Sequence, residues 1–314
     1  MPTALVTGGA GFIGSHLVQL LVGRGWSVRV LDNLSSGSLD NLAGTGAELI
    51  EGDIRDPQTV DQAAGGADFI FHLAAMISVS ESMAEPVECY RANVLGSLQV
   101  LEAARRAGAR RVVLSSSCAV YGNAGHPVDE TSETAPISPY AASKLAMEQA
   151  AKMTAVAFGL ETVCLRYFNV YGPRQAPDSP YAAAIPTFIR IMQAGRPPVI
   201  YGDGLQTRDF VFVGDVARAN LLAAEARLEP GAVFNIGSGR SITINEVVDT
   251  LRTLFPGLPD PSYLPPRPGD IRLSAGLIGR AGQALGYRPE TALPEGLAAT
   301  VEWARGATSR TAAE

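Results

Sequence analysis

Two side chains near the middle of the sequence have the types and spacing needed for proton transfer. Tyr140 and Lys144 lie four residues apart, directly after Pro139. Proline is favoured in the first turn of a helix, so both side chains are expected on one face of a helix that begins there. A nearby ammonium favours the phenolate over the phenol. We therefore predict that Tyr140 exchanges a proton with a hydroxyl of a bound molecule, and that a serine of the preceding run Ser115–Ser117 relays or positions that proton.

A glycine-rich segment near the N-terminus has the pattern of a phosphate-binding loop. Gly8, Gly11 and Gly14 follow the first strand-like run and open a helical pattern. Glycine permits a tight turn and lets backbone N–H groups approach a pyrophosphate at the N-terminus of the helix. The spacing is G-x-x-G-x-x-G, which is one residue longer in its first gap than the common dinucleotide fingerprint. The segment predicts a dinucleotide cofactor.

An acid follows the glycine loop at the position expected of dinucleotide-binding folds. Asp32 ends the second strand-like run, about 20 residues beyond the loop. A carboxylate there accepts hydrogen bonds from both adenosine ribose hydroxyls and repels a 2′-phosphate. The next residues are Asn33 and Leu34, not arginine, so the predicted cofactor is NAD rather than NADP. Asp53, after the third run, either bonds the adenine amino group or is an ordinary loop carboxylate.

The elements that must position these residues form a regular alternation through the first half of the chain. The strand-like runs are Ala4–Val6, Val28–Leu31, Glu48–Ile50, Phe69–His72, Val112–Ser115 and Val163–Arg166. The helical patterns between them include Ile13–Gly23, Val87–Ala107 and Pro139–Phe158. Continuous apolar runs suit strands that are buried on both sides. The pattern predicts an α/β fold with a doubly wound parallel sheet.

The pattern changes after about Gly172, where prolines and glycines become dense. We predict a nucleotide-binding domain over residues 1–172, a smaller substrate-binding α/β region over 173–307 and a frayed tail over 308–314. A helical pattern at Val216–Ala226 and a strand-like run at Ala232–Ile236 are expected to return to the first domain. The boundary is therefore not a single cut, because segments around 214–240 belong with the sheet.

Composition and charge exclude several classes of protein. The chain has 314 residues, of which 46% are apolar and 18% charged, as in ordinary globular proteins. A net charge of −6 gives no field that attracts nucleic acid. Three scattered cysteines provide neither a disulfide framework nor a zinc site, and we expect no metal. Without a signal-peptide pattern or an apolar run of about 18 residues, we expect no membrane association and a cytoplasmic location.

The sequence motifs as a set resemble those of the extended short-chain dehydrogenase/reductase family. The motifs that carry the resemblance are T-G-G-A-G-F-I-G, D-N-L-S-S-G, S-S-S-C-A-V-Y-G, Y-A-A-S-K, L-R-Y-F-N-V-Y-G-P-R and R-P-G-D. The resemblance covers essentially the whole chain, and within the family it is strongest to the UDP-glucose 4-epimerases of bacterial and archaeal type. It implies a Rossmann domain that holds NAD, a C-terminal nucleotide-sugar domain, and a homodimer formed through the two helical patterns Val87–Ala107 and Pro139–Phe158.

The resemblance also implies roles for individual residues. It makes Ser117, Tyr140 and Lys144 the catalytic set. The residues that it places at the cofactor are Gly8, Gly11, Phe12, Ile13, Gly14, Asp32, Asn33, Ser36, Gly37, Asp53, Ile54, Leu73, Ala74, Ala75, Asn93, Ser115, Tyr140, Lys144, Tyr167 and Phe168. Those that it places at a UDP-sugar are Ser78, Ser117, Tyr140, Asn169, Ala184, Ile185, Tyr201, Arg208, Arg267, Asp270 and Ser274.

Departures from the family pattern narrow the expected activity. Dehydratases of the family carry an Asp-Glu pair after the catalytic residue, and decarboxylases usually carry Glu before V-Y-G. This chain has Cys118 and Ala119 at these positions, which cannot do that acid–base work. The resemblance then implies a 4-epimerase acting on UDP-glucose and UDP-galactose through a 4-keto sugar. The resemblance also makes Ser274 the position that limits the size of the sugar, and its small side chain implies room for N-acetylated sugars. A UDP-glucuronate 4-epimerase and a sugar-nucleotide reductase remain alternatives.

Overall fold

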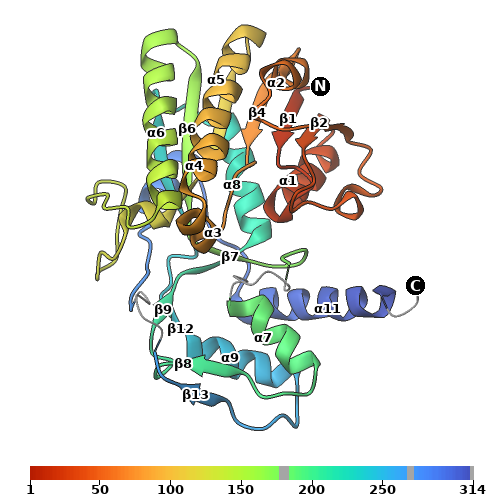
Figure 1. Cartoon of the computed structure of the whole chain (residues 1–314), viewed down its shortest axis with the longest axis vertical. Coiled ribbons are helices and arrows are strands. Elements are labelled where there is room, and N and C mark those ends of the chain that lie inside the picture. Colours follow the sequence, from red (N-terminus) through yellow and green to blue (C-terminus); the bar gives the residue numbers. More distant parts are fainter. Residues whose placement is uncertain (177–183, 267–271, 312–314) are drawn as a thin grey trace.

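The computed structural model describes residues 1–176, 184–266 and 272–311, and its centre is a seven-stranded parallel sheet (Figure 1). The strand order is β11-β6-β5-β4-β1-β2-β3. The strands are β1 (Thr3–Thr7), β2 (Ser27–Asp32), β3 (Glu48–Glu51), β4 (Phe69–His72), β5 (Arg111–Ser117), β6 (Glu161–Tyr167) and β11 (Ala232–Ile236). The predicted doubly wound α/β fold is confirmed.

Helices cover both faces of this sheet, which explains the continuous apolar runs. The helices that pack on it are α1 (Phe12–Gly23), α2 (Pro57–Ala64), α5 (Gly96–Ala107), α6 (Pro139–Phe158), α8 (Val213–Glu225) and α10 (Gly279–Leu285). Val6 packs in one core with α1, α8 and α10, whereas the adjacent Leu5 packs in a second core with α2, α5 and α6. Alternate residues of β1 therefore face opposite cores, and the three central residues Ala4, Leu5 and Val6 are all apolar.

The strand β11 comes from the second half of the chain but lies at the edge of the sheet. It pairs in parallel with β6, from Ala232 beside Val163 to Ile236 beside Tyr167. The helix α8 that precedes β11 packs against α1 on the same face. The chain thus passes through the C-terminal region and returns to the sheet before it ends.

The helical pattern predicted at Val87–Ala107 is not a regular α-helix. It is built from α4 (Pro86–Tyr90), a π-helical turn η2 (Arg91–Leu95) and α5. Within the turn, the Asn93 amide bonds both backbone groups of Met76, at 2.7 and 2.9 Å, and the Ser143 hydroxyl at 3.0 Å. These partners are distant in sequence, so the periodicity of the segment carries no sign of the wider turn. π-Helical turns of this kind are frequent at functional sites.

The C-terminal region has a core of its own, beyond the end of the sheet where β6 leads into β7 (Figure 1). Its helices are α7 (Ala184–Gln193), α9 (Ile244–Leu254) and α11 (Leu293–Thr311). Its short strands are β7 (Asn169–Tyr171), β8 (Val199–Tyr201), β9 (Thr207–Arg208), β10 (Phe210–Phe212), β12 (Ile242–Thr243) and β13 (Ser262–Leu264). Three short segments complete the described elements: α3 (Val79–Ala84), η1 (Leu39–Leu42) and η3 (Cys118–Tyr121). Within the described residues, no helix has the length and apolar character to cross a membrane.

Candidate active site

Ser117, Tyr140 and Lys144 come together where β5 ends and α6 begins. Pro139 occupies the first turn of α6, and the hydroxyl of the N-cap Ser138 accepts a hydrogen bond from the backbone N–H of Ala141 at 3.2 Å, which fixes where the helix begins. The backbone N–H of Tyr140 donates to the Ser82 hydroxyl at 3.1 Å, which anchors this end of α6 to α3. The Tyr140 hydroxyl is hydrogen-bonded to Ser117. The structure thus brings the three side chains together.

Burial dominates the electrostatics of this group. It raises the pKa of Tyr140 to about 12, although the hydrogen bond with Ser117 acts in the opposite direction. It also lowers the pKa of Lys144 to about 8, because a buried ammonium is poorly solvated. The Lys144 Nζ donates to the Ser115 carbonyl at 2.8 Å and lies 5.9 Å from the centre of the Tyr140 ring. The expected effect of the ammonium on the phenol is therefore outweighed by desolvation, and Tyr140 is a phenol at neutral pH.

The glycine loop is shaped so that only glycine fits its turn. Gly8 has a φ of 71°, and a Cβ there would lie 2.7 Å from the backbone nitrogen of Ala74. At Gly14, on the first turn of α1, a Cβ would lie 2.0 Å from the Gly8 carbonyl oxygen. The loop therefore packs directly on the start of α1, whose unpaired N–H groups favour an anion such as a pyrophosphate.

Asp32 keeps acceptor capacity for a ribose. Its carboxylate is 7% exposed and accepts one backbone N–H on each oxygen, from Ala10 and from Leu34, both at 2.9 Å. A carboxylate has about four acceptor positions, so two remain for hydroxyl donors. The bond from Ala10 also ties Asp32 to the glycine loop, so the loop and the predicted ribose site are held together.

Asp53, for which the sequence left two roles open, already has several hydrogen-bond donors. Arg55 donates to both of its oxygens, at 2.8 and 2.7 Å, and Asn33 donates to one of them at 2.9 Å. The hydrogen bonds from Arg55 lower the pKa of Asp53 to about 2. The backbone N–H of Arg55 supplies a fourth donor at 2.8 Å, so an adenine amino group would have to displace one of these partners. Arg55, which the sequence analysis missed, stands only two residues after Asp53 and also pairs with Glu88.

A cavity of about 470 Å³ joins the glycine loop to the catalytic group. That volume lies within the range of small-molecule and cofactor sites. The predicted cofactor residues that line it are Gly8, Gly11, Phe12, Ile13, Gly14, Asp32, Asn33, Ser36, Asp53, Ile54, Leu73, Ala74, Ala75, Ser115, Tyr140, Lys144 and Tyr167. The glycine turn, the helix N-terminus and the free acceptor positions of Asp32 fit NAD, which would occupy this cavity.

Three predicted cofactor residues are not among those that line the cavity. Gly37 packs on the loop, where a Cβ would lie 2.9 Å from that of Ala10. Asn93 is occupied by Met76 and Ser143, as described above. Phe168 is buried beside Gly276, in a small core that also contains Val120, Tyr121 and Val128. Of the three, Asn93 holds a residue that does line the cavity, Met76.

The predicted substrate residues are only partly brought together. Ser274 is hydrogen-bonded to Cys118, the neighbour of Ser117, and its backbone N–H bonds the Thr207 carbonyl at 3.1 Å. Asn169 and Arg208 also lie near this point, because the Asn169 backbone N–H bonds the Asp209 carbonyl at 2.9 Å. Ser78 caps α3.

Other substrate predictions lie farther from the catalytic group. Ala184 and Ile185 open α7, where Ile185 is buried in the core of the C-terminal region, and Tyr201 ends β8. Arg267 and Asp270 lie outside the described residues. Asp209, which the sequence analysis missed, is fully buried and accepts hydrogen bonds from Ser238 and Gly239, and this fixes the turn after β11 beside the site. Within the part of the chain described, no cluster of His, Cys, Asp or Glu could hold a metal ion.

Comparisons with known proteins agree with this architecture. The model of the "NAD dependent epimerase/dehydratase family" matches residues 4–237. The UDP-glucose 4-epimerase of Mycolicibacterium smegmatis is 40% identical over 96% of this chain and 98% of its own length. The structure of a UDP-N-acetylglucosamine 4-epimerase from Methanobrevibacter ruminantium, in complex with UDP-N-acetylmuramic acid, matches with a TM-score of 0.93 and 40% identity over 98% of this chain and 99% of that one.

Enzymes of other activities match as well. A UDP-N-acetyl-α-D-glucosaminuronate decarboxylase of Bacillus cytotoxicus is 33% identical over 96% of this chain and 97% of its own length. Family membership alone therefore leaves the reaction open, although it fixes the cofactor as NAD. The family model, the full-length relatives and the shared fold agree with the glycine loop and the Ser–Tyr–Lys group: this chain belongs to the NAD-dependent epimerase/dehydratase family.

Proposed function

We propose that this protein is a UDP-hexose 4-epimerase that interconverts UDP-glucose and UDP-galactose, and UDP-GlcNAc and UDP-GalNAc. The observation that carries the proposal is the composition of the catalytic group. Ser117, Tyr140 and Lys144 form a minimal set for moving one proton at a carbinol. The next two positions hold Cys118 and Ala119, so the carboxylates that the resemblance associates with elimination and decarboxylation are missing there.

In the proposed mechanism the chain handles the proton and the sugar. Tyr140, oriented by Ser117, first releases its own proton to solvent. The phenolate then takes the proton of the C4 hydroxyl as that carbon is oxidised, and the phenol later returns this proton to the 4-keto oxygen. Lys144, fixed on the Ser115 carbonyl, supplies positive charge beside the phenol as it loses its proton. The glycine loop and Asp32 would hold NAD, which would supply reversible hydride transfer at C4, so that the overall reaction has no net redox change. Inversion at C4 requires the keto sugar to turn over while the UDP stays bound.

The acceptance of N-acetylated sugars is proposed from the residues beside the catalytic group. The small side chains of Cys118 and Ser274 are hydrogen-bonded to each other. Burial raises the pKa of the Cys118 thiol to about 12, so it is a neutral thiol rather than a nucleophile. A bulky aromatic side chain at position 274 would fill space next to this pair. The small pair leaves that space for a 2-acetamido group.

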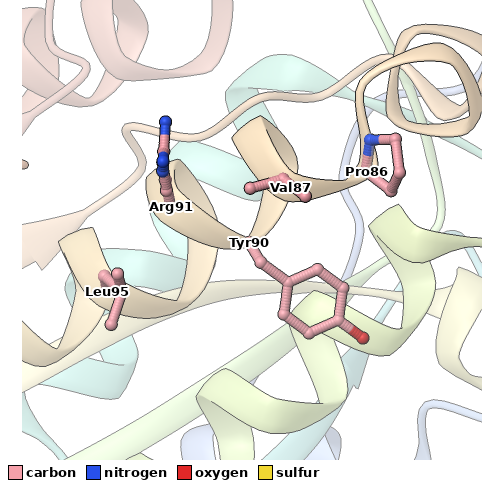
Figure 2. A pocket seen from close by; sticks show the side chains of 5 residues that line it. All are labelled: Pro86, Val87, Tyr90, Arg91 and Leu95. Carbon is pink, nitrogen blue, oxygen red and sulfur yellow. The ribbon is translucent and has the colours of Figure 1, made fainter.

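We further propose that the protein is a homodimer formed through α4, α5 and α6. Apolar side chains are exposed along this face, with Val87 64%, Leu95 54% and Phe158 58% accessible. Figure 2 shows the hollow that Val87, Tyr90 and Leu95 line. A second hollow lies between α5 and α6 and is lined by Leu98 of α5 and by Met153 and Phe158 of α6. A contiguous apolar surface with its own hollows suits a self-complementary twofold contact.

The function is tested by proton NMR of the purified protein with UDP-galactose and, separately, with UDP-GalNAc, and no cofactor is added. Conversion of both to the gluco forms is the expected result, and it would also show that NAD is resident. The matched control is Tyr140→Phe, which removes the hydroxyl but keeps the ring. Absence of conversion after NAD is supplied would overturn the proposal, and turnover of UDP-glucuronate or consumption of added NADH would identify the alternative reactions. Light scattering after gel filtration tests the dimer.

A further inference from the structure

A buried ion pair lies directly behind the catalytic group. Glu148 on α6 and Arg166 on β6 are 4% and 5% exposed. The guanidinium donates to both carboxylate oxygens, at 2.8 and 2.7 Å. This bidentate arrangement gives the strongest hydrogen bonding between an arginine and a carboxylate. The Ser116 hydroxyl donates to the same carboxylate at 2.5 Å. A desolvated pair is costly to bury unless its hydrogen bonds are satisfied, and here the carboxylate has three charged or hydroxyl donors.

This pair connects to Lys144 along two elements. Glu148 follows Lys144 by one turn of α6, so both side chains lie on the same face of the helix. On β5, the Ser115 carbonyl accepts from Lys144, and the adjacent Ser116 hydroxyl donates to Glu148. The helix is thereby fastened to the strand at two consecutive residues. The third residue of the run, Ser117, is the one that meets Tyr140.

The remaining contacts of the Arg166 guanidinium are with Tyr121. One of its nitrogens donates to the Tyr121 hydroxyl at 2.8 Å, and its guanidinium stacks on that ring at 4.8 Å. The Tyr121 hydroxyl in turn donates to Asn235 of β11 at 2.7 Å. The carboxylate of Glu148 thus binds Arg166 directly and also attracts Lys144, one helical turn away on α6.

Three titratable side chains that face Lys144, those of His72, Cys164 and Tyr140, carry no charge at neutral pH. Burial and the Lys144 charge lower the pKa of His72 on β4 to about 3. Burial raises the pKa of Cys164 on β6, so that its thiol stays protonated. Tyr140 is a phenol, as described above, and α4 contributes the thiol of Cys89. Among the residues described around Lys144, the anion is Glu148, and it opposes the loss of the Lys144 proton.

We propose that Glu148 is the counter-ion of Lys144: a positioning residue that keeps this buried amine in its ammonium form and holds the Ser115–Ser117 run against α6. Without this carboxylate, an unsolvated amine next to the surplus charge of Arg166 loses its proton more readily. The ion pair thereby supports the proton transfer at Tyr140 without touching a bound molecule.

The composition of the chain allows a direct measurement on Lys144. The sequence contains two lysines, Lys144 and Lys152. Lys152 is on the exposed side of α6. Protein grown with lysine labelled with ¹³C at Cε therefore gives two methylene signals, and Lys144→Arg assigns them. Each signal is followed from pH 6 to pH 11 on the purified protein with its retained cofactor, and the exposed Lys152 serves as an internal control.

The decisive variant is Glu148→Gln, which keeps the shape of the side chain and removes its charge. The pKa of Lys144 is expected to fall by about one unit or more, as for the loss of an opposite charge within a few ångströms, while that of Lys152 stays constant. Ser116→Ala keeps both charges and should leave the Lys144 pKa unchanged. An unchanged Lys144 pKa in Glu148→Gln would overturn the proposal.

A second variant covers the case in which an unpaired Arg166 prevents folding. Glu148→Gln combined with Arg166→Gln removes both charges, so no lone ion is buried. Because Glu148 is the nearer charge, the Lys144 pKa should still fall, but by less than in the single variant. A Lys144 pKa equal to that of the unmodified protein would overturn the proposal in this background as well.

The effect on turnover separates a counter-ion from a merely structural residue. In Glu148→Gln the alkaline limit of kcat should move to lower pH in step with the Lys144 pKa, while KM for the UDP-sugar stays the same. A pH-independent loss of activity would contradict the proposal. This readout rests on the proposed epimerase activity, whereas the lysine titration needs no substrate, so failure of the one is distinguishable from failure of the other.

Discussion

Replacing Gly14 by alanine would place a methyl group inside the phosphate-binding loop. The added Cβ would lie 2.0 Å from the Gly8 carbonyl oxygen and 2.8 Å from its carbonyl carbon. An ordinary contact between carbon and oxygen is about 3.3 Å, so the loop and the start of α1 would have to separate by about 1.3 Å. Both neighbours are backbone atoms, so no side-chain rotation can relieve the overlap.

That separation would dismantle the loop rather than shift it as a unit. The Gly11 N–H bonds the same Gly8 carbonyl at 3.2 Å, already at the long end of the usual range, and a displacement of this size breaks it. Overpacking of this kind costs about 1–3 kcal/mol. If the cost falls on the cofactor-bound state, NAD binding weakens by about 5- to 150-fold.

Two measurements test this expectation. The NAD that the purified protein retains is released with acid and quantified, and the melting temperature is recorded at increasing NAD concentrations. The matched control is Gly23→Ala at the other end of α1, where a Cβ would meet nothing within 4 Å. Alanine is the better helix former, so this control should keep its NAD and gain about 0.5 kcal/mol of stability. Full NAD content in Gly14→Ala would refute the steric reasoning.

Four further predictions follow from the site and the proposed interface. Tyr140→Phe should keep NAD and UDP binding but lower kcat by about 10²- to 10⁴-fold, as measured by NMR turnover; near-normal turnover would remove Tyr140 from its role. Ser274→Tyr should abolish turnover of UDP-GalNAc and spare that of UDP-galactose, and equal loss of both would contradict the specificity argument. Burial lowers the pKa of Lys144 from 10.5 in the unfolded chain to about 8, so the unfolded state binds more protons between these values. The contribution of this group to stability therefore rises with pH through that window and is lost below it. Urea unfolding of cofactor-free protein at pH 7.5 and pH 10 should show this slope, and Lys144→Met should lack it. Leu98→Asp combined with Phe158→Asp should yield monomers in light scattering, and a persistent dimer would place the interface elsewhere.

Local patterns in the sequence predicted most strands of the sheet and most of the residues that line the cofactor cavity. Residues 69–72 and 232–236 are strands with the predicted bounds, because apolar runs bounded by turn residues have few alternatives when both faces are buried. The glycine loop was similarly accessible, since the need for glycine at Gly8 and Gly14 is a backbone requirement within one turn. The end of β5 at Ser117 and the start of α6 at Pro139 meet, and this brings Ser117 to Tyr140.

Features that depend on contacts distant in sequence could not be predicted in the same way. Glu148 looks like an ordinary acid on a helix, and only the fold shows that Arg166 and Ser116 enclose it. The engagement of Asp53 by Arg55 changes what an apparently available carboxylate can bind. The balance of forces on Tyr140 likewise depends on burial, which no spacing of residues reports.

The return of β11 to the sheet has a consequence for how the chain folds. β6 ends at Tyr167, but the strand that covers its edge begins at Ala232, so the sheet stays open while the intervening C-terminal segments are synthesised. An exposed strand edge with unpaired backbone N–H and C=O groups is a template for pairing with another chain. A fragment that stops near residue 172 would therefore present this edge and lose the α8 face that covers α1, and it should aggregate instead of folding as a free-standing nucleotide-binding domain.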